Sequence, residues 1–236
     1  MGMNPMGHHA HYDFGVRTLP TDLLALERSL LAEVHLVVGI DEVGRGALAG
    51  PLTVGAVVIT CDAEPPSGLT DSKVLRARER EALIEPIERW CAAWSLGSVS
   101  ATEIDRWGLR LALAVAATRA MDRLPCAPTH ALIDGSFNLL DAPLRLEDEA
   151  LGAPTLAYAD LSHTTVVRGD ARCASIAAAS VLAKVHRDRT MRRLAEEFPA
   201  YGWDANKGYG VAAHRSAIEN RGPCDYHRRT WRLTAN

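Results

Sequence analysis

Two adjacent carboxylates, Asp41 and Glu42, follow the apolar, β-branched run Val37–Ile40 and precede the loop Gly44–Gly46, which reads Gly-Arg-Gly. Adjacent carboxylates repel each other, so a strand end that gathers two of them is most readily explained by a bound divalent cation. The glycines let a ligand approach the backbone closely. These residue types at this spacing predict metal-assisted chemistry on a phosphorylated substrate.

Two further acids occupy similar positions in the sequence. Asp134 follows the short apolar strand expected at His130–Ile133, and Asp170 directly precedes a helix expected at Ala171–Leu194. Strand ends of one sheet can converge on one cleft, and carboxylates without His or Cys ligands suit Mg²⁺ or Mn²⁺ rather than Zn²⁺. Because neighbouring strand residues face opposite sides, Asp41 and Glu42 can serve one site only if the strand ends or bulges there.

Each acid also has an ordinary structural explanation. Asp170 is well placed to cap a helix, Asp134 could start a turn, and Glu42 could form a surface ion pair with Arg45. Taken singly, these explanations compete with the metal site. The joint occurrence of four such acids and a Gly-Arg-Gly loop favours the site.

Composition indicates a globular protein with one main domain. The chain has 236 residues, of which 47% are hydrophobic and 23% charged, and its five cysteines form no CxxC pair. A disulfide framework or structural zinc site is therefore not expected, and the residues indicate a reducing cytoplasm. No secretory signal opens the chain, and the apolar run Leu109–Met121 is too short to span a bilayer. We expect a cytoplasmic protein that is neither exported nor embedded in a membrane.

Charge is unevenly distributed along the chain. The formal net charge is −3, but the segment from Lys184 to Arg232 holds eleven Lys and Arg against six Asp and Glu. This segment predicts a basic face that could bind nucleic acid. A solvated surface whose arginines cover apolar area would give the same count. Charge alone does not decide between the two.

Hydrophobic periodicity and turn residues indicate an α/β domain with a small helical C-terminal appendage. Pro86 should kink or divide the helix that contains it, and the alanines of the long helix should let it pack closely on a sheet. The region 136–165 is acidic, with only weak strand signals at Leu144–Leu146 and Thr155–Tyr158. The expected strands are Val34–Ile40, Leu52–Thr60, Trp94–Ser100, His130–Ile133 and Thr164–Val167; the expected helices are Arg76–Cys91, Leu109–Leu124, Ala171–Leu194 and Ala212–Asn220.

Taken together, the motifs resemble those of bacterial ribonuclease HII, a type 2 RNase H family. They occur in the family's order from about Val34 to Trp231, and Arg168 stands where a lysine is usual. The motifs are Gly39–Gly46, Asp71-Ser72-Lys73, Leu132–Gly135, Arg168-Gly169-Asp170, Ala177–Arg189, Asn206–Tyr209 and His227-Arg228-Arg229.

The resemblance implies an RNase H-like fold, with a central mixed five-stranded sheet flanked by helices. It also implies an endonuclease that hydrolyses the RNA strand of RNA/DNA hybrids and nicks 5′ of ribonucleotides embedded in duplex DNA. Asp41, Glu42, Asp134 and Asp170 would bind two divalent ions, Mg²⁺ or Mn²⁺, and cleavage would leave 5′-phosphate and 3′-hydroxyl ends.

The same resemblance implies how substrate is held. Gly44, Arg45 and Gly46 would read the ribose 2′-hydroxyl through backbone groups, and Tyr209 would stack on the deoxyribose that follows. Lys73 and Lys207 would hold phosphates; the alternative for each is an ordinary solvated lysine. Ser72 could contact DNA or cap the helix that follows it.

We expect a monomer with a flexible tail and lead-in helix at residues 1–33. Residues 34–197 would form the catalytic domain, and residues 198–236 a helical substrate-binding appendage. Two alternatives remain open from the residues alone. One is a nucleic-acid-binding module without catalysis, and the other is a dinucleotide-binding enzyme, because glycines follow the first strand. Against the latter, the β run that begins at Leu52 stands where a dinucleotide-binding helix should start.

Overall fold

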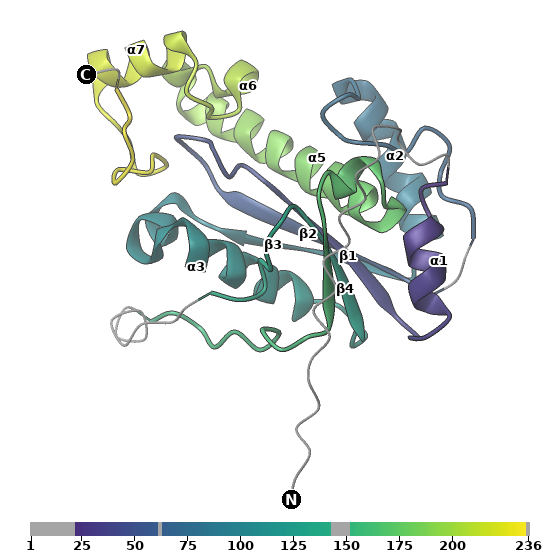
Figure 1. The fold of residues 1–236 in the computed structure, drawn as a ribbon. Coiled ribbons are helices and arrows are strands. Elements are labelled where there is room, and N and C mark those ends of the chain that lie inside the picture. Colours follow the sequence, from purple (N-terminus) through teal and green to yellow (C-terminus); the bar gives the residue numbers. More distant parts are fainter. Residues whose placement is uncertain (1–21, 61–62, 143–151, 235–236) are drawn as a thin grey trace, which may run out of the picture.

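A mixed five-stranded sheet forms the centre of the molecule (Figure 1). The computed structural model describes residues 22–60, 63–142 and 152–234. The strand order is β3-β2-β1-β4-β5; β1 pairs with β2, and β2 with β3, in antiparallel fashion, whereas the pairs β1–β4 and β4–β5 are parallel. The expectation of a mixed five-stranded sheet is confirmed. The strands are β1 Val37–Val43, β2 Leu52–Ile59, β3 Ala93–Val99, β4 His130–Asp134 and β5 His163–Val166.

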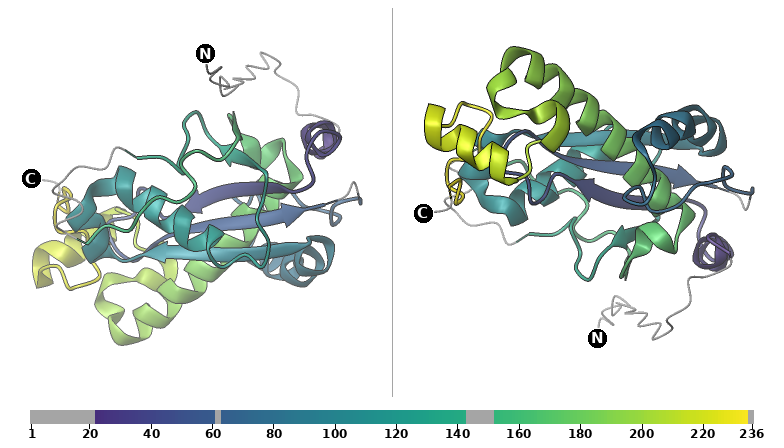
Figure 2. Two further views of the ribbon diagram at one scale, coloured as in Figure 1. Left: turned by 90° about the horizontal axis from the view of Figure 1, so that it is seen from below. Right: turned by 90° about the horizontal axis from the view of Figure 1, so that it is seen from above.

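Helices cover both faces of the sheet. The long helix α3 lies on one face, and α5 lies on the other together with α1 and α2 (Figures 1 and 2). The short helices α6 and α7 follow α5 and pack against its last turns. The helices are α1 Ala25–Leu31, α2 Ala77–Trp90, α3 Ala101–Met121, α5 Ala174–Glu197, α6 Trp203–Asn206 and α7 Ala212–Arg221, with short 3₁₀ turns at Gly169–Ala171 and Pro199–Tyr201.

Helix α5 approaches the backbone of the central strands closely. A Cβ atom at Gly39 of β1 would collide with the backbone of Ser175, and one at Gly55 of β2 would lie 2.5 Å from the carbonyl oxygen of Ala179. The alanines at positions 177 to 179 are fully buried in this contact. Small residues on both elements therefore allow the close packing that the alanine-rich sequence predicts.

Two expectations about helices are met only in part. Pro86 does not divide α2, which runs uninterrupted from Ala77 to Trp90; buried Leu83 and Ile87 hold the helix on both sides of the proline. Helix α3 begins eight residues before the expected start at Leu109, because Ser100 and Glu103 form a reciprocal capping box. The expected start coincides with an internal break at Gly108, where φ is 73°.

The region between β4 and β5 differs from its weak strand signals. Residues Thr155–Tyr158 form loop and turn rather than a strand. The signal at Leu144–Leu146 lies outside the described residues, as do residues 1–21 of the expected tail. In the described segments no helix is long and apolar enough to cross a membrane. The cysteines at positions 91, 126, 173 and 224 are free thiols.

Helix α1 is anchored to the start of α5 by a buried glutamate. Glu27 is 0% exposed, and one of its carboxylate oxygens accepts hydrogen bonds of 2.9 Å from both the backbone N–H and the hydroxyl of Ser175. Its other oxygen has no partner among the described residues. Burial raises the pKa of Glu27 to about 7, although the Ser175 hydrogen bonds act in the opposite direction.

We predict that Glu27→Gln makes stability less dependent on pH. The folded-state pKa is raised from 4.5 to about 7, so the wild-type protein loses stability as pH rises between these values, by about 3 kcal/mol at about 1.4 kcal/mol per pKa unit. Glutamine keeps the acceptor for Ser175 and does not ionise. In urea unfolding, the free energy of unfolding of Glu27→Gln relative to the wild type should rise by about 3 kcal/mol between pH 4.5 and pH 8. The exposed control Glu88→Gln should show no such rise. An equal difference at both pH values would contradict the prediction.

Candidate metal centre and substrate cleft

Three aspartates converge at one edge of the sheet. Carboxylate oxygens of Asp41, Asp134 and Asp170 all lie within 4.8 Å of one another. Asp41 and Asp170 are only 4% and 3% exposed, and Asp134 is half-buried. Three oxygen donors without a histidine or cysteine form a set that hard divalent cations prefer.

Strand pairing explains this convergence. Strands β1 and β4 are parallel neighbours in register, with Ile40 opposite Ile133, so the next residue of each strand is an aspartate. Asp170 arrives from the turn after β5, where Arg168 adopts a left-handed conformation with φ of 57°. This turn directs the N–H of Gly169 to Oδ1 of Asp134 at 2.7 Å. Two parallel strands and one strained turn therefore fix the three carboxylates.

Glu42 does not join the three aspartates at metal-binding distance. The two residues could share one site only if the strand ended or bulged at Asp41, and it does neither: β1 continues in regular register with β2 as far as Val43 opposite Thr53. Side chains alternate along a regular strand, so Glu42 faces away from Asp41. Glu42 still lines the same cleft and forms the expected ion pair with Arg45, at 3.6 Å. Its carboxylate therefore borders the aspartate cluster.

The electrostatics of the site favour a bound cation. Burial, followed by the charge of Asp134, holds the pKa of Asp41 well above its ordinary range, and burial and Asp170 raise the pKa of Asp134. Burial and Asp134 likewise raise the pKa of Glu42. Lys73 gives partial compensation, with its ammonium nitrogen 2.5 Å from Asp170. Partial burial would lower the pKa of Lys73, but the hydrogen bond and charge of Asp170 outweigh it and raise that pKa.

The ordinary explanations for two residues are excluded. Asp170 does not cap α5, because the N-cap residue is Cys173 and Asp170 lies within the preceding 3₁₀ turn. Ser72 does not cap α2, whose N-cap residue is Arg76. Ser72 is buried instead, and its hydroxyl lies 2.8 Å from that of Ser180, which in turn hydrogen-bonds Asp41. Ser72 therefore supports the aspartate cluster through Ser180.

Asp41 and Asp134 line a cleft of about 460 Å³, whereas Asp170 lies behind them and does not line it. The cleft brings together Asp41, Asp134 and Glu42 with most of the expected substrate-binding residues, but Lys207 does not line it. Three of its residues escaped the sequence reasoning: Arg80, Ser180 and Lys184. The spacing of Ser180 and Lys184, one turn apart on α5, is the signal that could have identified them. The complete lining is Asp41, Glu42, Val43, Gly44, Arg45, Gly46, Ser72, Lys73, Arg80, Asp134, Ser180, Lys184 and Tyr209.

The Gly-Arg-Gly loop presents backbone to this cleft. Gly44 has φ of +87°, and a Cβ there would collide with the side chain of Arg187; a Cβ at Gly46 would meet no atom within 4 Å. The Arg45 side chain turns back towards Glu42 and lies over the ring of Phe137, 5.2 Å from its centroid. The glycines therefore leave the loop backbone accessible from the cleft, and the half-exposed Arg45 side chain lines the cleft beside it.

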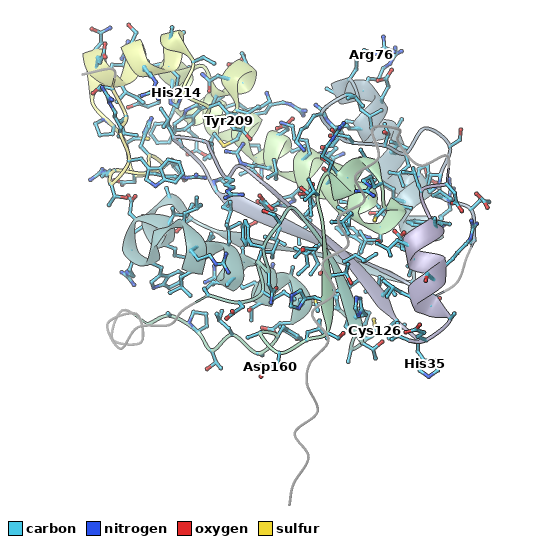
Figure 3. All side chains as sticks on the ribbon, viewed as in Figure 1. His35, Arg76, Cys126, Asp160, Tyr209 and His214 are labelled. Atoms are coloured by element: carbon cyan, nitrogen blue, oxygen red, sulfur yellow. The ribbon has the colours of Figure 1, made fainter. Side chains whose placement is uncertain are left out.

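Tyr209 also lines the cleft, and it lies next to the C-terminal helices (Figure 3). Its carbonyl oxygen accepts a hydrogen bond from Nδ1 of His214 at 2.9 Å, and its ring lies 5.5 Å from the guanidinium carbon of Arg187. Lys207, two residues before Tyr209, has φ of 52°, and its ammonium group contacts the carbonyl oxygen of Asp204. The structure therefore holds Tyr209 at the cleft and Lys207 just outside it.

The sequence and the structure were compared with known proteins. The family profile "Ribonuclease HII" matches residues 38–234. A ribonuclease HII of Synechococcus sp. is 47% identical over 199 residues, covering 83% of this chain and 94% of the relative. The ribonuclease H2 of Pyrococcus horikoshii superposes with a TM-score of 0.62 at 25% identity, covering 84% of this chain and 94% of that structure. Bst-RNase HIII in complex with Mn²⁺ superposes with a TM-score of 0.63 at 19% identity, covering 86% and 70%, and supports the fold alone.

The fold and the carboxylate cleft define a metal-dependent nuclease with an RNase H-like fold. The chain belongs to the ribonuclease HII family. It is therefore a ribonuclease H, an endonuclease that acts on RNA/DNA hybrids and depends on divalent metal. A dinucleotide-binding enzyme is excluded, because β1 is followed by the antiparallel strand β2 rather than by a helix.

We predict that Asp134→Asn stabilises the metal-free protein. The raised pKa of Asp134 means that its ionised form disfavours the folded state at neutral pH, and asparagine keeps an oxygen for the N–H of Gly169. In EDTA the melting temperature should rise by roughly 2–4 °C, the shift expected for about 1 kcal/mol in a chain of this size. The increase that Mg²⁺ or Mn²⁺ produces in the wild type should be lost, together with cleavage.

The control for this prediction is Asp160→Asn, on the exposed loop before β5 (Figure 3). That variant should keep both the melting temperature in EDTA and the gain with metal. A lower melting temperature for Asp134→Asn in EDTA, or an unchanged response to metal, would show that Asp134 is a structural acid.

Proposed function

We propose that this enzyme nicks duplex DNA on the 5′ side of an embedded ribonucleotide, as well as cleaving longer hybrids, by catalysis with two divalent ions. One observation carries the proposal: Asp41 and Asp134 of the aspartate cluster line a single cleft together with the Gly-Arg-Gly loop and Tyr209. The first group can bind the ions, and the other two can recognise the ribose and the nucleotide that follows. The reaction and its recognition would then share one site.

The residues that would hold the ions are Asp41, Asp134 and Asp170, with Glu42 at the border of the cluster. Bound divalent ions supply Lewis-acid activation of water and stabilisation of the leaving 3′-oxygen, so that 5′-phosphate and 3′-hydroxyl ends result. The protein itself positions the carboxylates and balances their charge. Ser180 orients Asp41 through a hydrogen bond, and Gly169 orients Asp134. Lys73 neutralises Asp170 and would exchange that carboxylate for a phosphate of the substrate.

Recognition of the ribose rests on the backbone of the Gly-Arg-Gly loop. The 2′-hydroxyl is the group that distinguishes RNA from DNA, and a backbone N–H can donate to its oxygen only if no side chain intervenes. The open space at Gly46 meets this requirement, and the half-exposed Arg45 side chain is engaged with Glu42. Tyr209 would then stack on the deoxyribose that follows, and Ser72, Lys73 and Lys207 would contribute to the phosphate-binding surface.

We predict that Gly46→Val separates function from stability. A Cβ atom at this position meets no heavy atom within 4 Å, so the free energy of unfolding should change by less than about 0.5 kcal/mol. Cleavage of every ribose-containing substrate should fall at least roughly tenfold, because the side chain enters the space that the ribose needs. Gly44→Ala should instead lower stability by about 1–3 kcal/mol, because of its φ of +87° and its contact with Arg187. Normal turnover by Gly46→Val would show that the Gly-Arg-Gly loop does not contact the ribose.

The proposal is tested with a duplex that contains one ribonucleotide and with a continuous RNA/DNA hybrid. With Mg²⁺ or Mn²⁺ the wild type should nick the first substrate on the 5′ side of the ribonucleotide, and end mapping should show a 5′-phosphate and a 3′-hydroxyl. Tyr209→Ala should lower this nicking roughly tenfold, since a stacking contact is worth about 1–3 kcal/mol, and should weaken duplex binding much less. Tyr209→Phe, which keeps the ring, should restore nicking.

Two results would count against the proposal. Absence of nicking by the wild type at a single ribonucleotide, with normal cleavage of the long hybrid, would limit the enzyme to hybrids. Unchanged nicking by Tyr209→Ala would show that Tyr209 is a packing residue and that the junction is recognised elsewhere.

A further inference from the structure

Two arginines are buried beneath the substrate cleft without a carboxylate partner. Arg187 of α5 and Arg228 of the C-terminal segment are both 0% exposed. Neither forms an ion pair with any acid in the described part of the chain. An unpaired buried charge disfavours folding unless its hydrogen bonds are well satisfied, so the two guanidinium groups require an explanation.

Arg187 binds backbone carbonyl groups from two distant segments. Its Nε donates to the carbonyl oxygen of Pro51 at 2.8 Å, and one terminal nitrogen donates to that of Ala49 at 3.1 Å. The other terminal nitrogen donates to the carbonyl oxygen of Lys207 at 2.8 Å. Arg187 therefore joins the segment after the Gly-Arg-Gly loop to the segment that carries Tyr209.

Arg228 binds the Gly-Arg-Gly loop itself. One terminal nitrogen donates to the carbonyl oxygen of Arg45 at 2.9 Å, and the other to that of Gly44 at 2.6 Å and of Gly50 at 3.3 Å. Its guanidinium carbon also lies 4.8 Å from the ring centroid of Trp231. One planar group thus holds two successive carbonyl groups of the loop from behind.

The N–H groups of this loop are left available. Those of Gly44, Arg45 and Gly46 donate to no acceptor within the described residues, and all three residues line the cleft. A loop with its carbonyl oxygens bound on one side and three consecutive N–H groups unbonded on the other is suited to bind an oxygen atom of a ligand.

We propose that Arg228, with Arg187 beside it, is a positioning residue for recognition of the ribose 2′-oxygen. Arg228 holds the carbonyl groups of Gly44 and Arg45 inward, and this keeps the N–H groups of the loop directed at the cleft. The proposal rests on the proposed function, in which this loop reads the ribose. It adds that side chains distant in the sequence, Arg187 and Arg228, fix the backbone conformation of the Gly-Arg-Gly loop.

The charge of Arg228 adds to this role. Burial, followed by the charge of Arg187, lowers the pKa of Arg228 to about 9, so the group still carries its charge at neutral pH. Lysine would keep that charge but cannot bind two successive carbonyl groups with one planar fork. Arg228→Lys therefore separates the geometric role from the electrostatic one.

The test is the preference for a ribonucleotide, measured as a ratio. All proteins carry Asp134→Asn, so that they bind without cleaving. Dissociation constants are measured by competition for a duplex containing one ribonucleotide and for the same duplex in all-DNA form. The preference is the dissociation constant for the all-DNA duplex divided by that for the ribonucleotide duplex. An unfolded fraction raises both constants by the same factor and cancels in this ratio. Loss of the contact between the loop and the 2′-oxygen lowers the ratio. Denaturant unfolding of each variant records stability separately.

We expect Arg228→Lys to reduce the ribonucleotide preference roughly tenfold, about the value of one hydrogen bond lost to the 2′-oxygen. The matched control is Arg119→Lys on α3, whose guanidinium group binds the carbonyl oxygen of Ser98 and the carboxylate of Glu103 away from the cleft. The control should keep the preference. If Arg228→Lys does not fold, Arg187→Lys carries the same test, because it loosens the adjoining carbonyl groups of Ala49 and Pro51.

An unchanged ratio in a folded arginine variant overturns the inference while leaving the proposed function intact. A reduced ratio in Arg119→Lys as well would overturn it too, because the effect would then be general. If the parent protein itself shows no preference for the ribonucleotide, the proposed reading of the 2′-oxygen fails, and this inference fails with it.

Discussion

Mutual repulsion among three largely desolvated aspartates is the constraint on which the rest of the structure depends. Asp41, Asp134 and Asp170 lie within 4.8 Å of one another, and one partly exposed lysine offsets their charge. Isolated side chains would separate, so the backbone must hold them. The parallel pairing of β1 with β4 does this for the first two, and the turn after β5 does it for the third. The close seating of α5 on the glycines of β1 and β2 makes that sheet edge rigid.

The cleft also depends on a second junction, between the Gly-Arg-Gly loop and the C-terminal segment. The N–H groups of Leu48 and Ala49 both donate to the carbonyl oxygen of Gly208, at 2.8 and 3.2 Å. Behind Tyr209, the indole N–H of Trp203 donates to Nε2 of His214 at 3.0 Å, which leaves Nδ1 of His214 to donate to the carbonyl oxygen of Tyr209. Burial lowers the pKa of His214, in keeping with this neutral form. Residues more than 150 positions apart in the sequence thereby form the two sides of one recognition surface.

Much of this architecture could be predicted from the sequence, because strand ends carry local signals. The β-branched runs indicate strands, and the acids and glycines that directly follow them indicate where a strand gives way to a loop. Each of these signals depends only on neighbouring residues. The capping box of Ser100 and Glu103 was equally local and could have been recognised. The position of Glu42 could not, since whether a strand continues past Asp41 is decided by pairing with β2. The role of Ser72 likewise depends on Ser180, which is 108 residues away.

Counting charges along the chain misleads for a related reason. The basic C-terminal segment appears in the sequence as a positive surface, yet two of its arginines, Arg187 and Arg228, are completely buried. Their charge acts from below the cleft, where solvent screens it less than at the surface. From there it counteracts part of the negative potential that the aspartates create in the cleft. A protein with a net charge of −3 can therefore hold a polyanion close to a cluster of carboxylates, because its cations are distributed around the cleft in three dimensions.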